Sequence, residues 1–233
     1  MGNTRPHPLL GFCFVLFQAL TLASTPLLAL PEAVPREQAD AEAARTQALA
    51  QACARTACRA KAKEITLNAP GDRIARFRTE KIPYADGGSI AIYPGESFAV
   101  RIRVQGEQLG EPVFEQIFDG PSPAKLLGHH PDAEAKALQD TKNMPVEALL
   151  YLYFKQDDKG PGMTLEITSA LPVTVKYDAV MFAATPDGIR PAPTSSCPVA
   201  SGIAALETWP QPLTMLLLSN FRVVDTARGF TCQ

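Results

Sequence analysis

A regular alternation of apolar and polar side chains in residues 97–105 constrains the fold more than any other feature of the sequence. The apolar side chains at every second position are Phe98, Val100, Ile102 and Val104. Successive side chains of a β-strand point to opposite faces, so the pattern predicts a strand with one face on a core and the other in water. Pro94 and Gly95, just before it, form a turn signal.

Seven other stretches have strand character and are separated by turn-forming residues. We expect strands at residues 73–79, 89–93, 112–118, 146–156, 163–169, 173–183 and 213–224. The stretch 191–198, rich in Pro and Ser, is expected to be irregular. About eight strands with turns between them argue for a sandwich or a barrel. We predict a mainly β chain, an immunoglobulin-like β-sandwich with an N-terminal α-helix.

The Ala-rich stretch at residues 36–63 contains no Gly or Pro and consists of strong helix formers. We expect a helix over the whole stretch, with a thin apolar face that either lies against the body or frays at its start. The domain organisation that follows is a linker at 24–35, this helix, and a β-sandwich domain at 64–233. An insertion at 119–145 interrupts that domain and contains a short helix near residues 132–139.

The beginning of the sequence predicts export. Residues 1–8 carry one Arg and no acidic side chain, and residues 9–23 are almost entirely apolar. This order is typical of a secretory signal peptide, and the apolar run is too short to span a bilayer. Ala23 offers a cleavage site, and Ala29 a later one. We expect a periplasmic or extracellular protein with no transmembrane segment in the mature chain.

Four cysteines remain once a signal peptide containing Cys13 is removed, and an even number in an exported chain favours two disulfides. We favour the local pair Cys53–Cys58 together with Cys197–Cys232. The alternative is two long bridges that join the N-terminal helix to the C-terminal half. A zinc site is disfavoured because the spacing of Cys53 and Cys58 is wrong and no His is near. A bond between these two requires the helix to end or distort, because they lie on different helical faces.

The overall charge disfavours nucleic acid as a partner. The formal net charge is −2 over 233 residues, too close to balance for a nucleic-acid-binding surface. The hydrophobic fraction of 46% and charged fraction of 20% are those of an ordinary globular protein. No glycine-rich nucleotide-binding motif occurs, and we expect no cofactor.

One short cluster resembles a metal or acid–base site. His129 and His130 stand side by side, with Asp132 and Glu134 shortly after them. Imidazole and carboxylate groups are metal ligands. Adjacent His side chains in a coil diverge, however, and the two acids suit the first turn of a helix, where the dipole favours negative charge. We favour a solvated loop followed by a helix, and keep metal binding as the weaker interpretation.

A basic surface is the second candidate site. Arg76 and Arg78 lie on one expected strand, and Arg101 and Arg103 lie on another. If the two strands pair, these side chains form a patch for an anionic glycan, a lipid headgroup or an acidic protein. The alternative is that acids on adjacent strands, such as Glu107, Glu111 and Glu115, balance them.

These observations favour a secreted or periplasmic, non-enzymatic protein that binds another protein or a cell-envelope component through sheet edges or loops. Two other functions stay open. One is a metal-assisted hydrolase with its site near His129 and His130. The other is a carrier with an apolar ligand inside the sandwich. A sandwich fold by itself does not decide between them.

Overall fold

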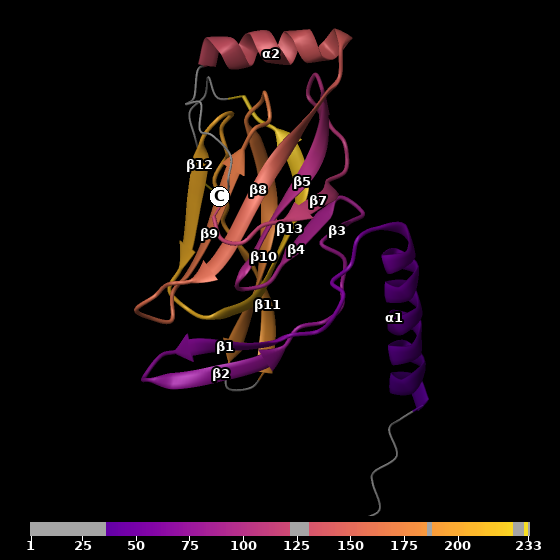
Figure 1. The fold of residues 1–233 in the computed structure, drawn as a ribbon, viewed down its shortest axis with the longest axis vertical. Helices are drawn as coiled ribbons and strands as arrows, with labels where there is room; N and C mark the ends of the chain where they lie inside the picture. Colours follow the sequence, from indigo (N-terminus) through magenta and orange to yellow (C-terminus); the bar gives the residue numbers. More distant parts are fainter. Residues whose placement is uncertain (1–35, 122–130, 186–187, 226–230, 233) are drawn as a thin grey trace, which may run out of the picture. The chain divides into compact units, whose positions relative to one another are not determined.

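A computed structural model describes residues 36–121, 131–185, 188–225 and 231–232 (Figure 1). The chain divides into two units, residues 1–41 and 42–233. Of the first unit, only the residues that begin helix α1 (Arg36–Arg55) are described. The expected signal peptide and linker lie outside the described residues. Neither of the described helices has the length and apolar character needed to cross a bilayer.

The chain is mainly β, as predicted, with 52% of it in strands and 16% in helices. The five-stranded sheet has the order β11-β10-β13-β4-β3 and the six-stranded sheet the order β12-β9-β8-β5-β6, with β7 also paired to β5. Within the described residues, the strands of both sheets pair antiparallel. The five-stranded sheet consists of β3 (Ala85–Asp86), β4 (Ser89–Ile92), β10 (Val175–Thr185), β11 (Gly188–Thr194) and β13 (Leu213–Val223). The six-stranded sheet consists of β5 (Glu96–Gln105), β6 (Gln108–Leu109), β7 (Val113–Ile117), β8 (Val146–Gln156), β9 (Met163–Ser169) and β12 (Ala204–Trp209).

Two further elements lie outside these sheets. Strands β1 (Glu64–Ala69) and β2 (Arg73–Arg78) form an antiparallel hairpin that is a sheet of its own. Helix α2 (Pro131–Asn143) precedes β8 and contains the short helix expected near residues 132–139. Figure 1 labels both strands of the hairpin.

Side chains from both large sheets form one hydrophobic core. Strand β5 supplies the four residues that the alternation predicted, and all four are fully buried. Strands β4 and β13 of the five-stranded sheet supply Ile90, Ile92, Leu216 and Leu218. Complete burial of one such side chain stabilises the fold by about 1.5–3 kcal/mol. Burial of apolar side chains in this shared core is the main contribution that holds the two sheets together.

All eight expected strands are present, and the structure adds β1, β3, β6, β11 and β12. Strand β11 contradicts the expectation of an irregular stretch at its Pro-rich part. Pro191 pairs with Phe182 and Pro193 with Val180, both on β10. Proline lacks an N–H group, but β11 is an edge strand, where a missing donor is tolerated.

Helix α1 ends at Arg55, eight residues before the expected end at residue 63. The cause is the disulfide between Cys53 and Cys58, whose Cα atoms are 5.3 Å apart. Residues five positions apart on a helix face different directions, so this bond forces the chain out of the helix. The next residues run antiparallel to another segment, with a bridge between Cys58 and Pro83.

Candidate functional site

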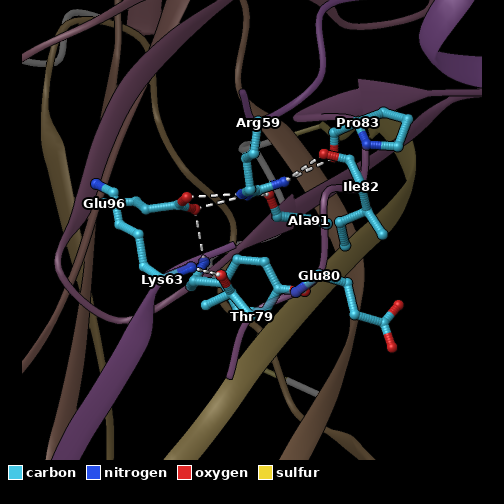
Figure 2. A network of polar contacts seen from close by, with 9 residues as sticks. Arg59, Lys63, Thr79, Glu80, Ile82, Pro83, Ala91 and Glu96 are labelled. Carbon is cyan, nitrogen blue, oxygen red and sulfur yellow. Dashed lines mark hydrogen bonds and ion pairs between the residues drawn. The ribbon is translucent and has the colours of Figure 1, made fainter. Parts of the chain in front are cut away.

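The first cluster of buried polar groups surrounds Arg59, directly after the first disulfide (Figure 2). Arg59 is only 5% exposed, and its Nε and Nη2 atoms each donate to the carboxylate of Glu96 at 2.6 Å. Its remaining N–H groups donate to three backbone carbonyls at 2.8–3.1 Å. These carbonyls belong to Ile82, Pro83 and Ala91. All five donors of the guanidinium are therefore used inside the protein.

Two tyrosine rings enclose the same guanidinium. The Cζ atom of Arg59 lies 4.4 Å from the ring centre of Tyr84 and 4.6 Å from that of Tyr93. Burial raises the pKa of both phenols above the usual value. The hydroxyl of Tyr93 accepts a hydrogen bond from the backbone N–H of Glu80. The backbone N–H of Tyr93 donates to the carboxylate of Glu96. The Arg59 cluster, by which we mean Arg59, Glu96, Tyr84 and Tyr93, anchors the segment after α1 and leaves no Arg59 donor for a ligand.

A second buried cluster joins β10 and β12 to the segment that carries Cys197. The hydroxyl of Tyr177 donates to Oε1 of Glu207 at 2.7 Å, and the backbone N–H of Cys197 donates to the same oxygen at 2.8 Å. The hydroxyl of Ser196 donates to the carbonyl of Tyr177. Oε2 of Glu207 is buried and has no hydrogen-bond partner among the described residues. We call Tyr177, Glu207, Ser196 and Cys197 the Glu207 cluster.

Burial determines how these groups titrate. Glu207 is 7% exposed, and burial raises the pKa of its carboxyl group despite the bonds from Cys197 and Tyr177. Burial also raises the pKa of Tyr177 well above its ordinary value, and the neighbouring charge of Glu207 adds to the effect. The Glu207 cluster can hold a proton at its carboxyl group more tightly than a solvated glutamate would.

Both favoured disulfides are present, and the alternative of two long bridges is wrong. Cys53 bonds to Cys58, and Cys197 bonds to Cys232, whose Cα atoms are 4.2 Å apart. Beside the second bond, Nζ of Lys176 donates to the carbonyl of Thr231 at 2.9 Å. Each disulfide therefore lies next to one of the two buried polar clusters. Two disulfides suit an oxidising compartment.

Only half of the predicted metal cluster is described. His129 and His130 lie outside the described residues, whereas Asp132 and Glu134 occupy the first turn of α2, as expected of helix-starting acids. Glu134 also accepts a hydrogen bond from the backbone N–H of Thr174, a long-range contact that the sequence did not indicate. In the described parts of the chain, no three potential ligands gather into a metal site. Metal binding near His129 stays a prediction.

The predicted basic patch is divided between separate sheets. Strand β2 pairs with β1, and β5 pairs with β6, β7 and β8, so the assumed pairing of the two Arg-bearing strands is wrong. Arg101 contacts Glu115 and Glu147, each at 3.1 Å, which matches the alternative of balanced charge. Arg103 is exposed on the same strand. Arg76 and Arg78 are exposed on the β1–β2 hairpin.

The described surface also has an open groove of ≈ 350 Å³ between α1 and the five-stranded sheet. Its apolar lining includes Leu49, Ala52, Ile82 and Leu217. Arg45 and Glu80 lie at the groove and form an ion pair of 2.6 Å. The groove is open to solvent, unlike the enclosed sandwich interior expected for an apolar-ligand carrier.

The outer strands of the six-stranded sheet expose large apolar side chains. Val113 and Ile117 on β7 and Leu206 on β12 are each more than half exposed.

No protein-family model, no curated protein and no solved structure matches this chain. The functional interpretation therefore depends on these surfaces and on the buried clusters.

Proposed function

We propose that this chain is an exported, non-enzymatic protein whose immunoglobulin-like β-sandwich binds a protein or a cell-envelope component through the edges of the six-stranded sheet. One observation carries the proposal: Val113, Ile117 and Leu206 are exposed on strands at the two sides of that sheet. An edge strand offers unpaired backbone groups to an incoming strand, and its exposed side chains supply specificity.

The sequences of the edge strands support this choice of surface. Edge strand β11 of the other sheet contains Pro191 and Pro193, which cannot donate hydrogen bonds to an added strand. Neither β7 (VFEQI) nor β12 (AALETW) contains a proline or a lysine, the residues that commonly protect an edge. Strands β7 and β12 are therefore better places for strand addition than β11.

Substitutions on the edges test this proposal. We expect Val113→Lys/Ile117→Lys on β7 or Leu206→Lys on β12 to abolish cross-linking of the mature protein to its partner in intact cells. Ile189→Lys is the matched control, because Ile189 is similarly exposed but lies on the proline-bearing strand β11. If both edge variants retain the same cross-linked partner as the wild type, the edge proposal is wrong.

Export has separate support and a separate test. The signal-like start of the chain and the two disulfides both suit an oxidising compartment. We expect the protein recovered from cells to begin near residue 24 or residue 30 and to have no free thiol. Intact-mass measurement with and without reduction checks both points. Full-length, reduced protein in the cytosolic fraction would contradict export.

A further inference from the structure

The β1–β2 hairpin has two chemically different faces. The inner face contributes Leu67 to the hydrophobic core, and Ile65 and Phe77 pack against that core. The outer face consists of the alternate positions 64, 66 and 68 on β1 and 74, 76 and 78 on β2, which are all exposed. Across this face Ile74 pairs with Asn68, Arg76 with Thr66, and Arg78 with Glu64. We call these six residues the outer face.

The hairpin is held in a defined position on the domain. Oε1 of the Gln156 side chain accepts a hydrogen bond from the backbone N–H of Asn68, and its Nε2 donates to the carbonyl of the same residue, both at 2.8 Å. Leu67 is buried on the opposite side. The outer face is therefore presented by a fixed support, and its binding would need little ordering of the backbone.

Charge is concentrated around this hairpin. Residues 61–81 contain six basic side chains (Lys61, Lys63, Arg73, Arg76, Arg78 and Lys81) and three acidic ones (Glu64, Asp72 and Glu80). The segment thus has a net charge of +3, and because the whole chain has −2, the rest has −5.

The two arginines of the outer face differ from the paired arginines elsewhere. Arg45, Arg55, Arg59, Arg101 and Arg222 all form ion pairs with carboxylates. Arg76 and Arg78 have no such ion pair with any described residue and are exposed. Their guanidinium groups are available for an external anion, and guanidinium binds phosphate through parallel hydrogen bonds.

Ile74 indicates which anion fits. It is 60% exposed on the outer face, two residues before Arg76. A soluble acidic chain could satisfy the arginines, whereas a lipid headgroup layer also gives the isoleucine an apolar boundary to enter. We propose that the outer face docks the protein on an anionic phospholipid bilayer. This is a second binding surface, separate from the sheet edges, and it rests on the proposed function only through export. Glu64 opposes the attraction, so binding is weak and reversible.

Vesicle sedimentation tests the proposal with the mature, disulfide-bonded protein. Vesicles of equimolar phosphatidylcholine and phosphatidylglycerol should carry the protein down, and vesicles of phosphatidylcholine alone should not. Added salt should reverse the binding. From the usual gain for one basic residue at an anionic surface, Arg76→Thr/Arg78→Thr should lower the partition coefficient by about thirtyfold. Ile74→Thr should cause a smaller loss, by the same factor at every salt concentration at which binding is still measurable.

A control variant with the same change in charge separates this surface from net charge. Arg103 on β5 and Lys136 on α2 are exposed and form no ion pair with a described residue. Arg103→Thr/Lys136→Ala therefore removes two positive charges elsewhere. This control should bind vesicles as the wild type does. Equal losses in the two double variants would overturn the proposal. Binding to soluble polyglutamate through Arg76 and Arg78, without vesicle binding, would also overturn it and indicate an acidic chain as partner.

The result is distinguishable from failure of the edge proposal. The β7 and β12 edge variants should bind anionic vesicles normally, because neither strand belongs to the hairpin. Loss of vesicle binding in these variants would contradict docking by the outer face alone. If the wild-type protein does not bind vesicles but still forms the edge-dependent cross-link, only the lipid inference is wrong.

Discussion

The Arg59 cluster and the Glu207 cluster each hold a disulfide-bearing segment, but they differ in how completely their buried charged group is hydrogen-bonded. Arg59 uses all five of its donors, and its carboxylate partner receives two of them. Glu207 receives two hydrogen bonds on one oxygen and has none from described residues on the other. The first is a matched ion pair, and the second is a carboxyl group with an incomplete set of partners.

This difference separates two consequences of burying charge. Removing either partner of a matched pair strongly lowers the free energy of unfolding, because the remaining charge is then buried without compensation. An incompletely matched carboxyl group favours its neutral form, which makes the stability of the fold depend on pH. The Arg59 cluster should therefore contribute strongly to the stability of the protein, and the Glu207 cluster should make that stability depend on pH.

The largest expected effect is the loss of Arg59. Arg59→Met removes both guanidinium hydrogen bonds to the Glu96 carboxylate and the side-chain donors to three carbonyls, of which the contact with Ala91 is buried. This should lower the free energy of unfolding by about 3–5 kcal/mol. Denaturant unfolding with the disulfides intact measures this. Arg45→Met is the control, since its exposed pair with Glu80 is worth at most about 1 kcal/mol. Similar losses in both variants would show that the Arg59 cluster is not special.

The disulfide beside the Glu207 cluster should stabilise the protein more than the disulfide beside the Arg59 cluster, the reverse of the order expected for the clusters themselves. Cys197–Cys232 joins residues 35 apart and Cys53–Cys58 residues 5 apart. In the loop-entropy model the longer bridge contributes about 4 kcal/mol and the shorter about 2 kcal/mol. Replacing each pair by Ala and comparing unfolding free energies checks the order. An equal or larger loss for Cys53→Ala/Cys58→Ala would mean that the short bridge acts mainly on the native Arg59 segment.

A smaller effect is expected when the Tyr177 hydroxyl is removed, and this change tests which groups hydrogen-bond to Glu207. Tyr177→Phe removes one of the two donors to the Glu207 carboxyl group. We expect a loss of about 1–3 kcal/mol, as for a buried acceptor that loses a partner, with the loss larger where Glu207 is ionised. Unfolding measured on both sides of the Glu207 titration checks this. A loss independent of pH would show that the phenol contributes by packing alone.

Local patterns in the sequence predicted the parts of this molecule that depend on neighbouring residues. Alternation placed the buried face of β5, and the spacing of the cysteines indicated a local bond that ends α1. Strand β11 was missed because its prolines match a loop composition, and only its position at a sheet edge makes them acceptable in a strand.

Both buried clusters were missed because their partners are distant in the sequence. Arg59 stands in the run CRAKAK, which resembles an exposed basic stretch, and its acceptors come from residues 82–96. Glu207 precedes Trp209 by two positions in β12, and this spacing puts it on the same inward face as the buried tryptophan. Alternation around Trp209 was the one available signal. The outer face of the hairpin shows the reverse: its arginines were noted, but their strand partners were not.

The smallest effect is a change in the shape of the pH profile. Glu207 has a raised pKa in the folded protein, so the folded state holds the proton more tightly than the unfolded state. Its contribution to stability is fully present below the usual carboxyl pKa of 4.5 and is lost as pH rises through the folded-state value. Asp178 has the opposite sign, because hydrogen bonds from Asn220 and Arg222 lower the pKa of its carboxyl group. Its contribution is present above the unfolded pKa and is lost as pH falls.

Two charge-removing variants separate these opposite contributions. Glu207→Gln should remove the decline in unfolding free energy above the usual carboxyl pKa, while Asp178→Asn should remove part of the decline on acidification. Unfolding free energies measured across the acidic and neutral range, at one salt concentration, provide both profiles. If Glu207→Gln leaves the profile parallel to that of the wild type, Glu207 titrates alike in both states. The second oxygen would then be solvated in the folded protein, and the contrast with Arg59 would disappear.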